Sequence, residues 1–227
     1  PTQITNPRVK GGLITTPNIS NNFGNSTATC VIGNPASFVP YKIPGYDDLK
    51  SIYFTQSKAA KKTTTATSLE LVKDGYLYNY TSTSGVSVGS IEAGGNYNYT
   101  GTAVVFVDGT LSINGNVTGT SNMGLVLVVG GDINIAPTVT QINAVLISAG
   151  RINTGGSGCS QNAVTASQLV VNGSLISLSS SSNIVFCRNL GPGNTSPAEL
   201  INNESKYLVI LRNLFADTLQ KWSEITQ

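Results

Sequence analysis

Among the residue types in this sequence, acidic side chains are the ones that could catalyse cleavage of a polysaccharide. A repeated region over residues 85–190 holds three of them, Glu92, Asp108 and Asp132. Polysaccharide-cleaving sites need clustered carboxylates, often with calcium, or a carboxylate pair flanking the scissile bond. Asp108 precedes a glycine and Asp132 follows one. Because one precedes and the other follows its corner glycine, we expect them to lie on different sides of the corner and not to form a pair. We therefore predict solvated turn carboxylates, with no catalytic or metal-binding residues.

Histidine is absent from all 227 residues, which excludes nucleophilic triads of the Ser-His-Asp or Cys-His type. The sequence also contains no Gly-rich phosphate-binding loop that ends in Lys-Ser/Thr. No cofactor is expected. We predict that the chain is not an enzyme.

Three cysteines, Cys30, Cys159 and Cys187, match no zinc or redox spacing and include no CxxC motif. At most one internal disulfide can form. Cys159 with Cys187 is the preferred pair, because the 28 residues that separate them are little more than one turn of a solenoid. The alternative is three inert buried thiols.

Alternating tyrosines mark two short segments. Tyr76, Tyr78 and Tyr80 recur at every second residue, and so do Tyr97 and Tyr99. A period of two places the rings of each run on one face of a strand. We predict an aromatic strip that stacks on sugars or packs on a partner protein. The alternative is that the rings only cover one flank of the fold.

Sequons for asparagine-linked glycosylation are frequent, although their number is close to what the Asn, Ser and Thr content yields by chance. Such sites suit the surface of an exported protein. The candidates are Asn18, Asn25, Asn79, Asn98, Asn116, Asn172, Asn194 and Asn203.

Five short segments share a glycine that follows β-branched residues and precedes alternating apolar residues. They read SVGSIEA, FVDGTLSI, VGGDINI, SAGRINT and VNGSLIS. The steps between their glycines are 20, 22, 19 and 23 residues, which indicates a loose repeat. The shared glycines are Gly89, Gly109, Gly131, Gly150 and Gly173.

The residue two places after each glycine is always apolar, so one inward position recurs in every turn. Stacked turns of this kind build the interior ladder of a parallel β-helix, because no turn can bury its apolar residues alone. The step length favours a right-handed parallel β-helix over a left-handed one made of hexapeptides; an antiparallel sandwich is the alternative. The predicted ladder consists of Ile91, Leu111, Ile133, Ile152 and Leu175.

Residues 1–84 show a weaker pattern. The segment VKGGLIT at 9–15 resembles VGGDINI at 129–135, so the solenoid is predicted to start there. The proline-rich stretch 18–50 predicts an irregular excursion.

Two further segments before residue 85 have local signals. Apolar alternation around Asp74-Gly75 predicts a hairpin or insert over 69–80. The Lys-rich and Thr-rich run 57–67 predicts a solvated loop whose deletion is nearly neutral.

Residues 191–227 change character again. Gly191-Pro192-Gly193 interrupts the ladder, and 197–227 is the one stretch with helical spacing. We predict that this partly helical segment caps the end of the solenoid, which otherwise exposes unpaired backbone groups above an open core. Its predicted apolar face consists of Leu208, Leu211, Phe215, Leu219 and Trp222.

Composition limits the partners of the chain. Hydrophobic residues make up 40% and charged residues only 11%, which suits one domain rich in strands and turns. A net charge of +2 gives no strong field to attract nucleic acid. The chain begins at Pro1 without an initiator Met or an apolar run long enough to span a bilayer, so we expect a processed or excised piece.

The Gly-centred turns FVDGTLSINGNVTG, LVVGGDINI and LVVNGSLIS, with the closing SPAELI and NLFADTLQKWSEITQ, resemble a known family. They are similar to the carboxy-terminal β-helical part of pilin-like PilX-type surface proteins of Patescibacteria. This resemblance implies an exported protein that is anchored or assembled through an amino-terminal pilin-like helix. A more distant resemblance to bactofilins implies a cytosolic polymer instead.

Together these patterns predict an all-β, right-handed parallel β-helix in three parts. Residues 1–84 hold the start of the solenoid with an irregular excursion and insert, 85–190 the β-helix turns, and 191–227 a partly helical C-terminal cap.

The predicted function is a non-enzymatic structural or adhesive component of an extracellular appendage or cell envelope. Expected partners are other surface or pilus subunits, including copies of the chain, and glycans. No nucleic acid partner is expected. Contact with a membrane is expected only through an amino-terminal segment that is missing from this sequence. Two alternatives stay open: a carbohydrate-binding or carbohydrate-cleaving β-helix, and a self-polymerising bactofilin-like filament subunit.

Overall fold

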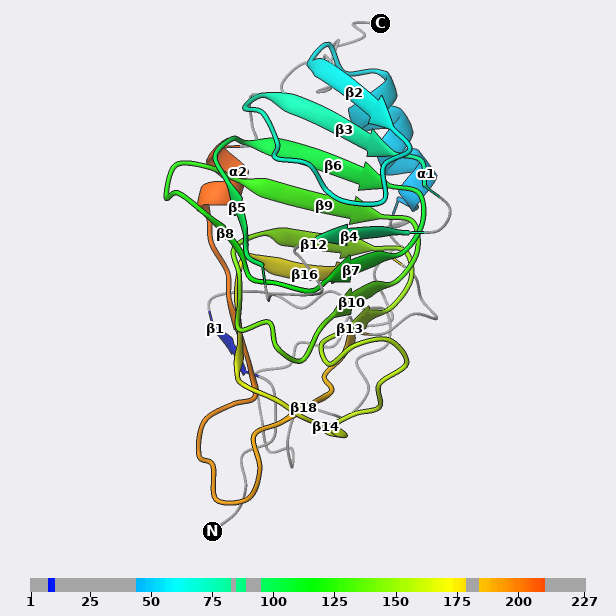
Figure 1. The fold of residues 1–227 in the computed structure, drawn as a ribbon. Coiled ribbons are helices and arrows are strands. Elements are labelled where there is room, and N and C mark those ends of the chain that lie inside the picture. Colours follow the sequence, from blue (N-terminus) through cyan, green and yellow to red (C-terminus); the bar gives the residue numbers. More distant parts are fainter. Residues whose placement is uncertain (1–7, 11–43, 83–84, 89–94, 179–183, 211–227) are drawn as a thin grey trace, which may run out of the picture.

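The computed structural model describes residues 8–10, 44–82, 85–88, 95–178 and 184–210 (Figure 1). These residues form mostly short strands in parallel sheets, with few helices. The chain passes from a first sheet to a second, to a third and back to the first, and its turns stack as a solenoid. Every pairing between described strands is parallel, so the antiparallel sandwich alternative is wrong.

Three sheets form the walls. Sheet 1 contains β2 (Ala60–Thr64), β3 (Tyr76–Tyr80), β6 (Ala103–Val107), β9 (Leu125–Val129), β12 (Val145–Ser148) and β16 (Ser174–Ser177). Sheet 2 contains β4 (Val86–Val88), β7 (Leu111–Ile113), β10 (Ile133–Ile135), β13 (Ile152–Asn153) and β17 (Ile184–Val185). Sheet 3 contains β5 (Tyr97–Tyr99), β8 (Val117–Gly119), β11 (Gln141–Ile142), β15 (Leu169–Asn172) and β19 (Glu199–Asn202).

Two short additions complete the strand set. β1 (Arg8–Lys10) comes from the other end of the sequence and pairs with β19, beyond the last turn of sheet 3. β14 (Val164–Thr165) and β18 (Arg188–Asn189) pair with each other below the regular turns (Figure 1).

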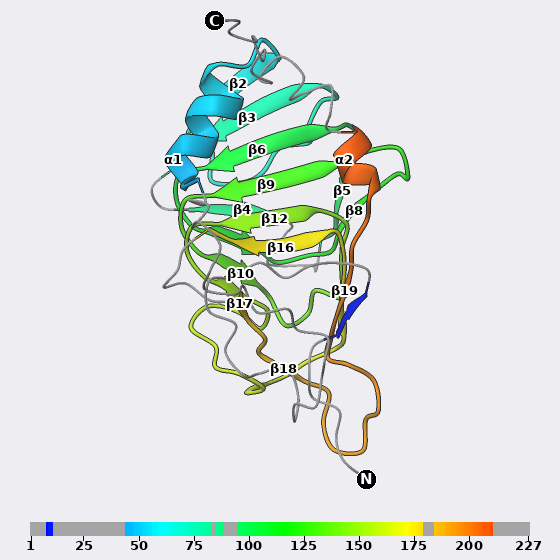
Figure 2. The same cartoon turned by 180° about the vertical axis from the view of Figure 1, so that it is seen from behind.

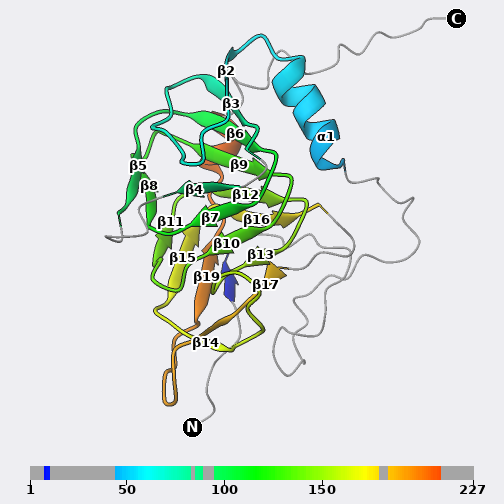
Figure 3. The same cartoon turned by 45° about the vertical axis from the view of Figure 1, so that its right-hand side comes forward.

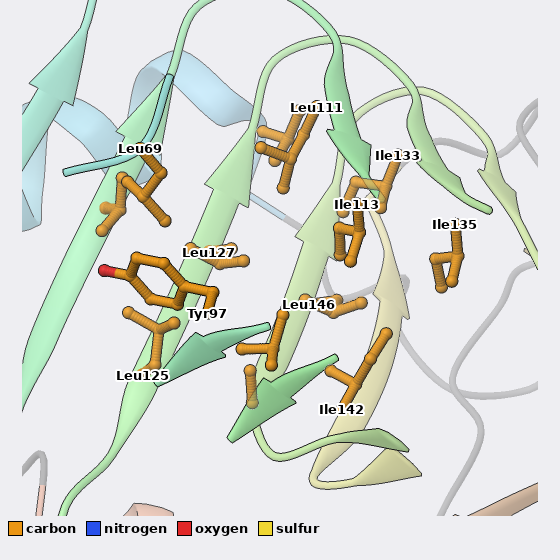
Figure 4. Packing of buried hydrophobic residues seen from close by; sticks show 14 of the residues in the cluster. Leu69, Tyr97, Leu111, Ile113, Leu125, Leu127, Ile133, Ile135, Ile142 and Leu146 are labelled. Atoms are coloured by element: carbon orange, nitrogen blue, oxygen red, sulfur yellow. The ribbon is translucent and has the colours of Figure 1, made fainter. Parts of the chain in front are cut away.

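The interior is a stack of aliphatic side chains, part of which Figure 4 shows. Leu111, Ile133 and Ile152 are register partners in sheet 2 and are fully buried, which confirms the central part of the predicted ladder. Val86 continues this ladder before Leu111, and Ile184 continues it after Ile152. Ile91 lies outside the described residues.

The predicted place of Leu175 in that ladder is wrong. Leu175 is buried, but its register partner is Leu146 in sheet 1. The glycine alignment fails there because Gly173 occupies the corner between sheets 3 and 1, where an added Cβ would overlap the carbonyl of Ala144. A glycine in the repeat therefore indicates that the chain turns a corner, but not which of the three corners of the solenoid it turns.

The central strands β6 and β9 of sheet 1 are buried on both faces, which explains their unbroken apolar runs AVVFV and LVLVV. A helical segment covers the outer face, formed by α1 (Tyr46–Leu49) and the π-helical η1 (Lys50–Thr55). Tyr46 and Phe54 contact the buried ring of Phe106 edge-on. Figures 2 and 3 show this segment on the outside of the strands.

Two expectations for the region before residue 85 are wrong. The one strand in segment 69–80 is β3, which pairs in parallel with β2 and β6, so the segment forms no hairpin; the alternative, an insert, stays a prediction. The Lys-rich run 57–67 contains β2, the edge strand of sheet 1, instead of a solvated loop. An edge strand with one neighbour buries little, which is why its burial pattern carries no period of two. The stacked strands thus extend on both sides of 85–190.

The described part of the C-terminal segment contains strand β19 and a short helix, α2 (Lys206–Ile210). Tyr207 is buried in the outer cluster of sheet 1, whereas Leu208 is 83% exposed, so the prediction that Leu208 packs on the solenoid is wrong. Figures 1 and 2 place α2 beside sheet 1 near the ends of β6 and β9. Leu211, Phe215, Leu219 and Trp222 lie outside the described residues.

Candidate functional site

The predicted tyrosine strip lies inside the solenoid. Tyr76, Tyr78 and Tyr80 belong to the inner face of β3, and Tyr97 and Tyr99 to that of β5. All are buried except half-buried Tyr76. The prediction of one face for each run is correct. The prediction of an exposed strip for sugars or partners is wrong, because the rings fill the interior of the first turn.

Tyrosine hydroxyls hold a chain segment over this first turn. The segment 66–73, between β2 and β3, buries Leu69 and Val72 in the same cluster as the tyrosine rings. Three of its main-chain N–H groups donate to hydroxyls: Glu70 to Tyr80 (3.0 Å), Val72 to Tyr97 (3.2 Å) and Lys73 to Tyr78 (2.8 Å). The Tyr97 hydroxyl donates onward to the Glu70 carbonyl at 2.7 Å. We call Tyr78, Tyr80, Tyr97 and segment 66–73 the tyrosine cap.

The electrostatics of the tyrosine cap keep its hydroxyls protonated. Burial raises the pKa of Tyr97 and of Tyr80, because the phenolate would lose its hydration. Both hydroxyls are therefore neutral at physiological pH. They accept hydrogen bonds from main-chain N–H groups of a segment whose described strand pairing is the single bridge of Ser68 to Ser87.

A second polar cluster lies in the last turns, and the sequence reasoning missed it. Arg188 of β18 is fully buried. Its guanidinium donates to four main-chain carbonyls of two preceding turns: Thr154 (2.6 Å), Val139 (2.6 Å), Ser167 (2.9 Å) and Ala136 (2.8 Å). We call these groups, with Glu199, the arginine cluster. Burial lowers the pKa of Arg188 to about 10, so it remains charged at neutral pH.

Glu199 is the acidic member of the arginine cluster. Its carboxylate Oε1 accepts hydrogen bonds from the Thr154 hydroxyl (2.6 Å) and the Arg188 main-chain N–H (3.0 Å). Its Oε2 is buried and has no hydrogen-bond partner among the described residues. Burial raises the pKa of Glu199, against the opposing effect of these hydrogen bonds and of the Arg188 charge.

One signal in the sequence could have pointed to this cluster. Arg188 and Glu199 are the only charged residues between positions 152 and 203. A basic residue that lies beside a cysteine, in a stretch with only one other charged residue, differs from the charged residues of a solvent-exposed segment.

The predicted disulfide between Cys159 and Cys187 is present, with the two Cα atoms 6.0 Å apart. It joins the two segments that leave the regular turns, 154–168 between β13 and β15 and 186–198 between β17 and β19. The Cys187 main-chain N–H donates to the Thr154 hydroxyl at 2.8 Å, so the disulfide adjoins the arginine cluster. Cys30 lies outside the described residues.

The acidic residues of the turns have structural contacts. Asp108 accepts hydrogen bonds from the Tyr46 hydroxyl (2.7 Å) and Lys50 (2.5 Å), which fastens α1 and η1 to the end of β6. Asp132 accepts a hydrogen bond from the Arg151 main-chain N–H of the next turn at 2.7 Å. Glu92 lies outside the described residues. Among the residues described, no group of three or more His, Cys, Asp or Glu is placed to hold a metal ion.

The glycosylation candidates have different environments. Asn79 is buried beneath the outer cluster, and both amide atoms of Asn172 are hydrogen-bonded, to Asn143 and Asn202. Asn116 accepts main-chain hydrogen bonds through Oδ1.

Asn98 is exposed on β5, an edge strand of sheet 3. Two more candidates border the last turn: Asn194 is half-buried and Asn203 exposed. Asn18 and Asn25 lie outside the described residues.

Comparison of the chain with protein-family models, with curated proteins and with solved structures finds no match. None of the described helices is long and apolar enough to cross a membrane.

Proposed function

We propose that this chain is a non-enzymatic structural or adhesive module of an extracellular appendage or cell envelope, folded as a right-handed parallel β-helix. Its partners on this proposal are other subunits of the same surface structure.

The observation that carries the proposal is how the polar side chains of the turns are used. The tyrosine cap, the arginine cluster, Asp108 and Asp132 all bind groups of the fold itself. A solid solenoid of this kind suits a load-bearing or spacing element, because each turn is joined to the next along the whole wall. A reactive or transport site would instead need polar groups directed into an open cavity.

The disulfide supports a location outside the cytosol. Structural disulfides persist in oxidising compartments and are rare where glutathione keeps thiols reduced. The Cys159–Cys187 bond joins two segments of one domain, as expected for a structural disulfide.

The two alternative functions receive less support. A carbohydrate-binding face rested on the tyrosines, and four of the five are buried. A self-polymerising filament needs an open sheet edge at each end, whereas edge strand β2 carries the exposed Lys61 and Lys62. Charged side chains on an edge strand oppose pairing with another copy.

Labelling of intact cells tests the proposal. Cells that produce the full-length gene product are incubated with antibodies against this chain, before and after lysis. We expect full labelling of intact cells and its loss after external protease treatment. Labelling that needs lysis, with a cytosolic control protein released in parallel, would contradict an extracellular role.

A further inference from the structure

The two segments 154–168 and 186–198 are the places where the last turns depart from the regular solenoid. They lie side by side below sheet 2 in Figures 1 and 3, and β14 pairs with β18 between them. The disulfide, the arginine cluster and hydrogen bonds from Asn162 N–H to the Phe186 carbonyl and from Gln168 Nε2 to the Pro197 carbonyl also connect them.

The disulfide and the arginine cluster depend on each other through adjacent residues. Cys187 precedes Arg188, whose Nε donates to the carbonyl of Thr154. Thr154 also accepts the Cys187 N–H through its hydroxyl, and an added Cβ at Gly155 would overlap the Cβ of Cys187. The bond thus holds Arg188 at the position where its guanidinium reaches four carbonyls.

Burying Arg188 and Glu199 is costly unless their hydrogen bonds are complete. The covalent tie offsets this cost by keeping segment 186–198 in place. Without it, hydration of the two charged side chains favours an open arrangement of both segments.

We propose that the Cys159–Cys187 disulfide is a redox-sensitive latch, whose reduction separates segments 154–168 and 186–198 while the stacked strands of the solenoid stay folded. The proposal concerns the folded chain and does not depend on where it is displayed.

The chemistry requires a dithiol as reductant. Cys159 is half-buried and Cys187 fully buried, so a thiolate of the dithiol attacks the sulfur of Cys159. A mixed disulfide forms and the Cys187 thiolate leaves, taking up a proton. The second thiol of the reductant then displaces Cys159. The protein disulfide gains two electrons and two protons, and the dithiol is oxidised to a disulfide.

Opening is confined to the last turns because each turn of a solenoid contacts only its neighbours. The strands of the earlier turns, such as β6 with β9, keep all their pairings when 154–168 and 186–198 separate. Of the earlier turns, only the carbonyls of Ala136 and Val139 lose a bond, the one to Arg188.

Hydrogen exchange of the full chain, with and without dithiothreitol, tests the latch. We expect reduction to remove protection in β14 and β18 and to leave protection in β6, β7 and β9 unchanged. The Cys159→Ser/Cys187→Ser variant should reproduce the reduced pattern without dithiol.

Cys30→Ser is the matched control and should respond to dithiol as the wild type does. Unchanged protection after complete reduction, verified by thiol alkylation and mass measurement, would overturn the proposal. So would equal loss of protection in β6 and β9, or a response that vanishes in Cys30→Ser.

Discussion

At the scale of single residues, the stability of the solenoid rests on side chains that repeat in register. Ile133 has Leu111 on one side and Ile152 on the other, and all three have no exposed surface. A substitution at one position therefore alters the packing of both adjacent turns.

Ile133→Asp should strongly destabilise the chain, by several kcal/mol, because it buries an unpaired charge between two aliphatic neighbours. Ile133→Val, the matched control, should cost about 0.5–1.5 kcal/mol. Urea unfolding monitored by circular dichroism measures both. Equal midpoints for wild type and Ile133→Asp would show that the ladder is misplaced.

Tyr97→Phe tests the tyrosine cap. Removing the hydroxyl leaves the Val72 N–H and the Glu70 carbonyl unpaired, at a cost of about 1–3 kcal/mol. Tyr76→Phe is the control, because the Tyr76 hydroxyl makes no hydrogen bond to the described residues. Thermal unfolding of both variants should separate them, and identical losses would argue against the hydroxyl contacts.

The raised pKa of Glu199 predicts a pH dependence. The folded state holds the proton more tightly than the unfolded chain, where the pKa is near its usual 4.5. The stability due to this group is full below the unfolded pKa and is lost as pH rises through the folded pKa. Glu199→Gln should abolish this loss of stability with rising pH. Urea unfolding from about pH 4 to pH 7 measures it, and a pH profile parallel to wild type would contradict the shift.

At the scale of elements, the edges of the sheets decide whether the chain stays separate. β2 is paired on one side only and presents Lys61 and Lys62. Lys62 forms an ion pair with Glu70 of the tyrosine cap. The edge thus carries charge where another copy would have to pair.

Lys61→Thr/Lys62→Thr should make the chain associate through the β2 edge, because threonine suits a strand and removes the repulsion. Lys58→Thr/Lys73→Thr changes the net charge equally at exposed positions outside β2 and is the control. Sedimentation velocity over a range of concentrations should show association of the first variant alone. Association of both would point to net charge instead.

Part of this element structure is visible in the sequence. The steps of 22 and 19 residues between Leu111, Ile133 and Ile152 identify the regular turns. The repeat fails where segments are inserted: Ile184 follows Ile152 by 32 residues. The sequence does not show which corner a glycine occupies. The alignment on Gly173 therefore assigned Leu175 to the wrong sheet.

The prediction of an exposed tyrosine strip failed for a different reason. A period of two shows that the tyrosines share a face, but tyrosine suits the inside and the outside of a wall equally. Arg188 was missed because burial of an isolated cation depends on main-chain carbonyls that only the folded turns bring together. The disulfide was the preferred pairing because the 28 residues that separate its cysteines are little more than one turn.

At the scale of the whole molecule, the solenoid is a stack with different ends. The tyrosine cap closes the first turn, and the arginine cluster and disulfide tie the last turns. These features suit a module with fixed neighbours more than a subunit that stacks on itself.

Electron microscopy of the purified, oxidised chain at increasing concentration shows whether the two ends of the solenoid are closed. We expect separate compact particles of constant size at every concentration. Filaments or end-to-end stacks of the wild-type chain would show that its ends are open, and would contradict the closed module described here.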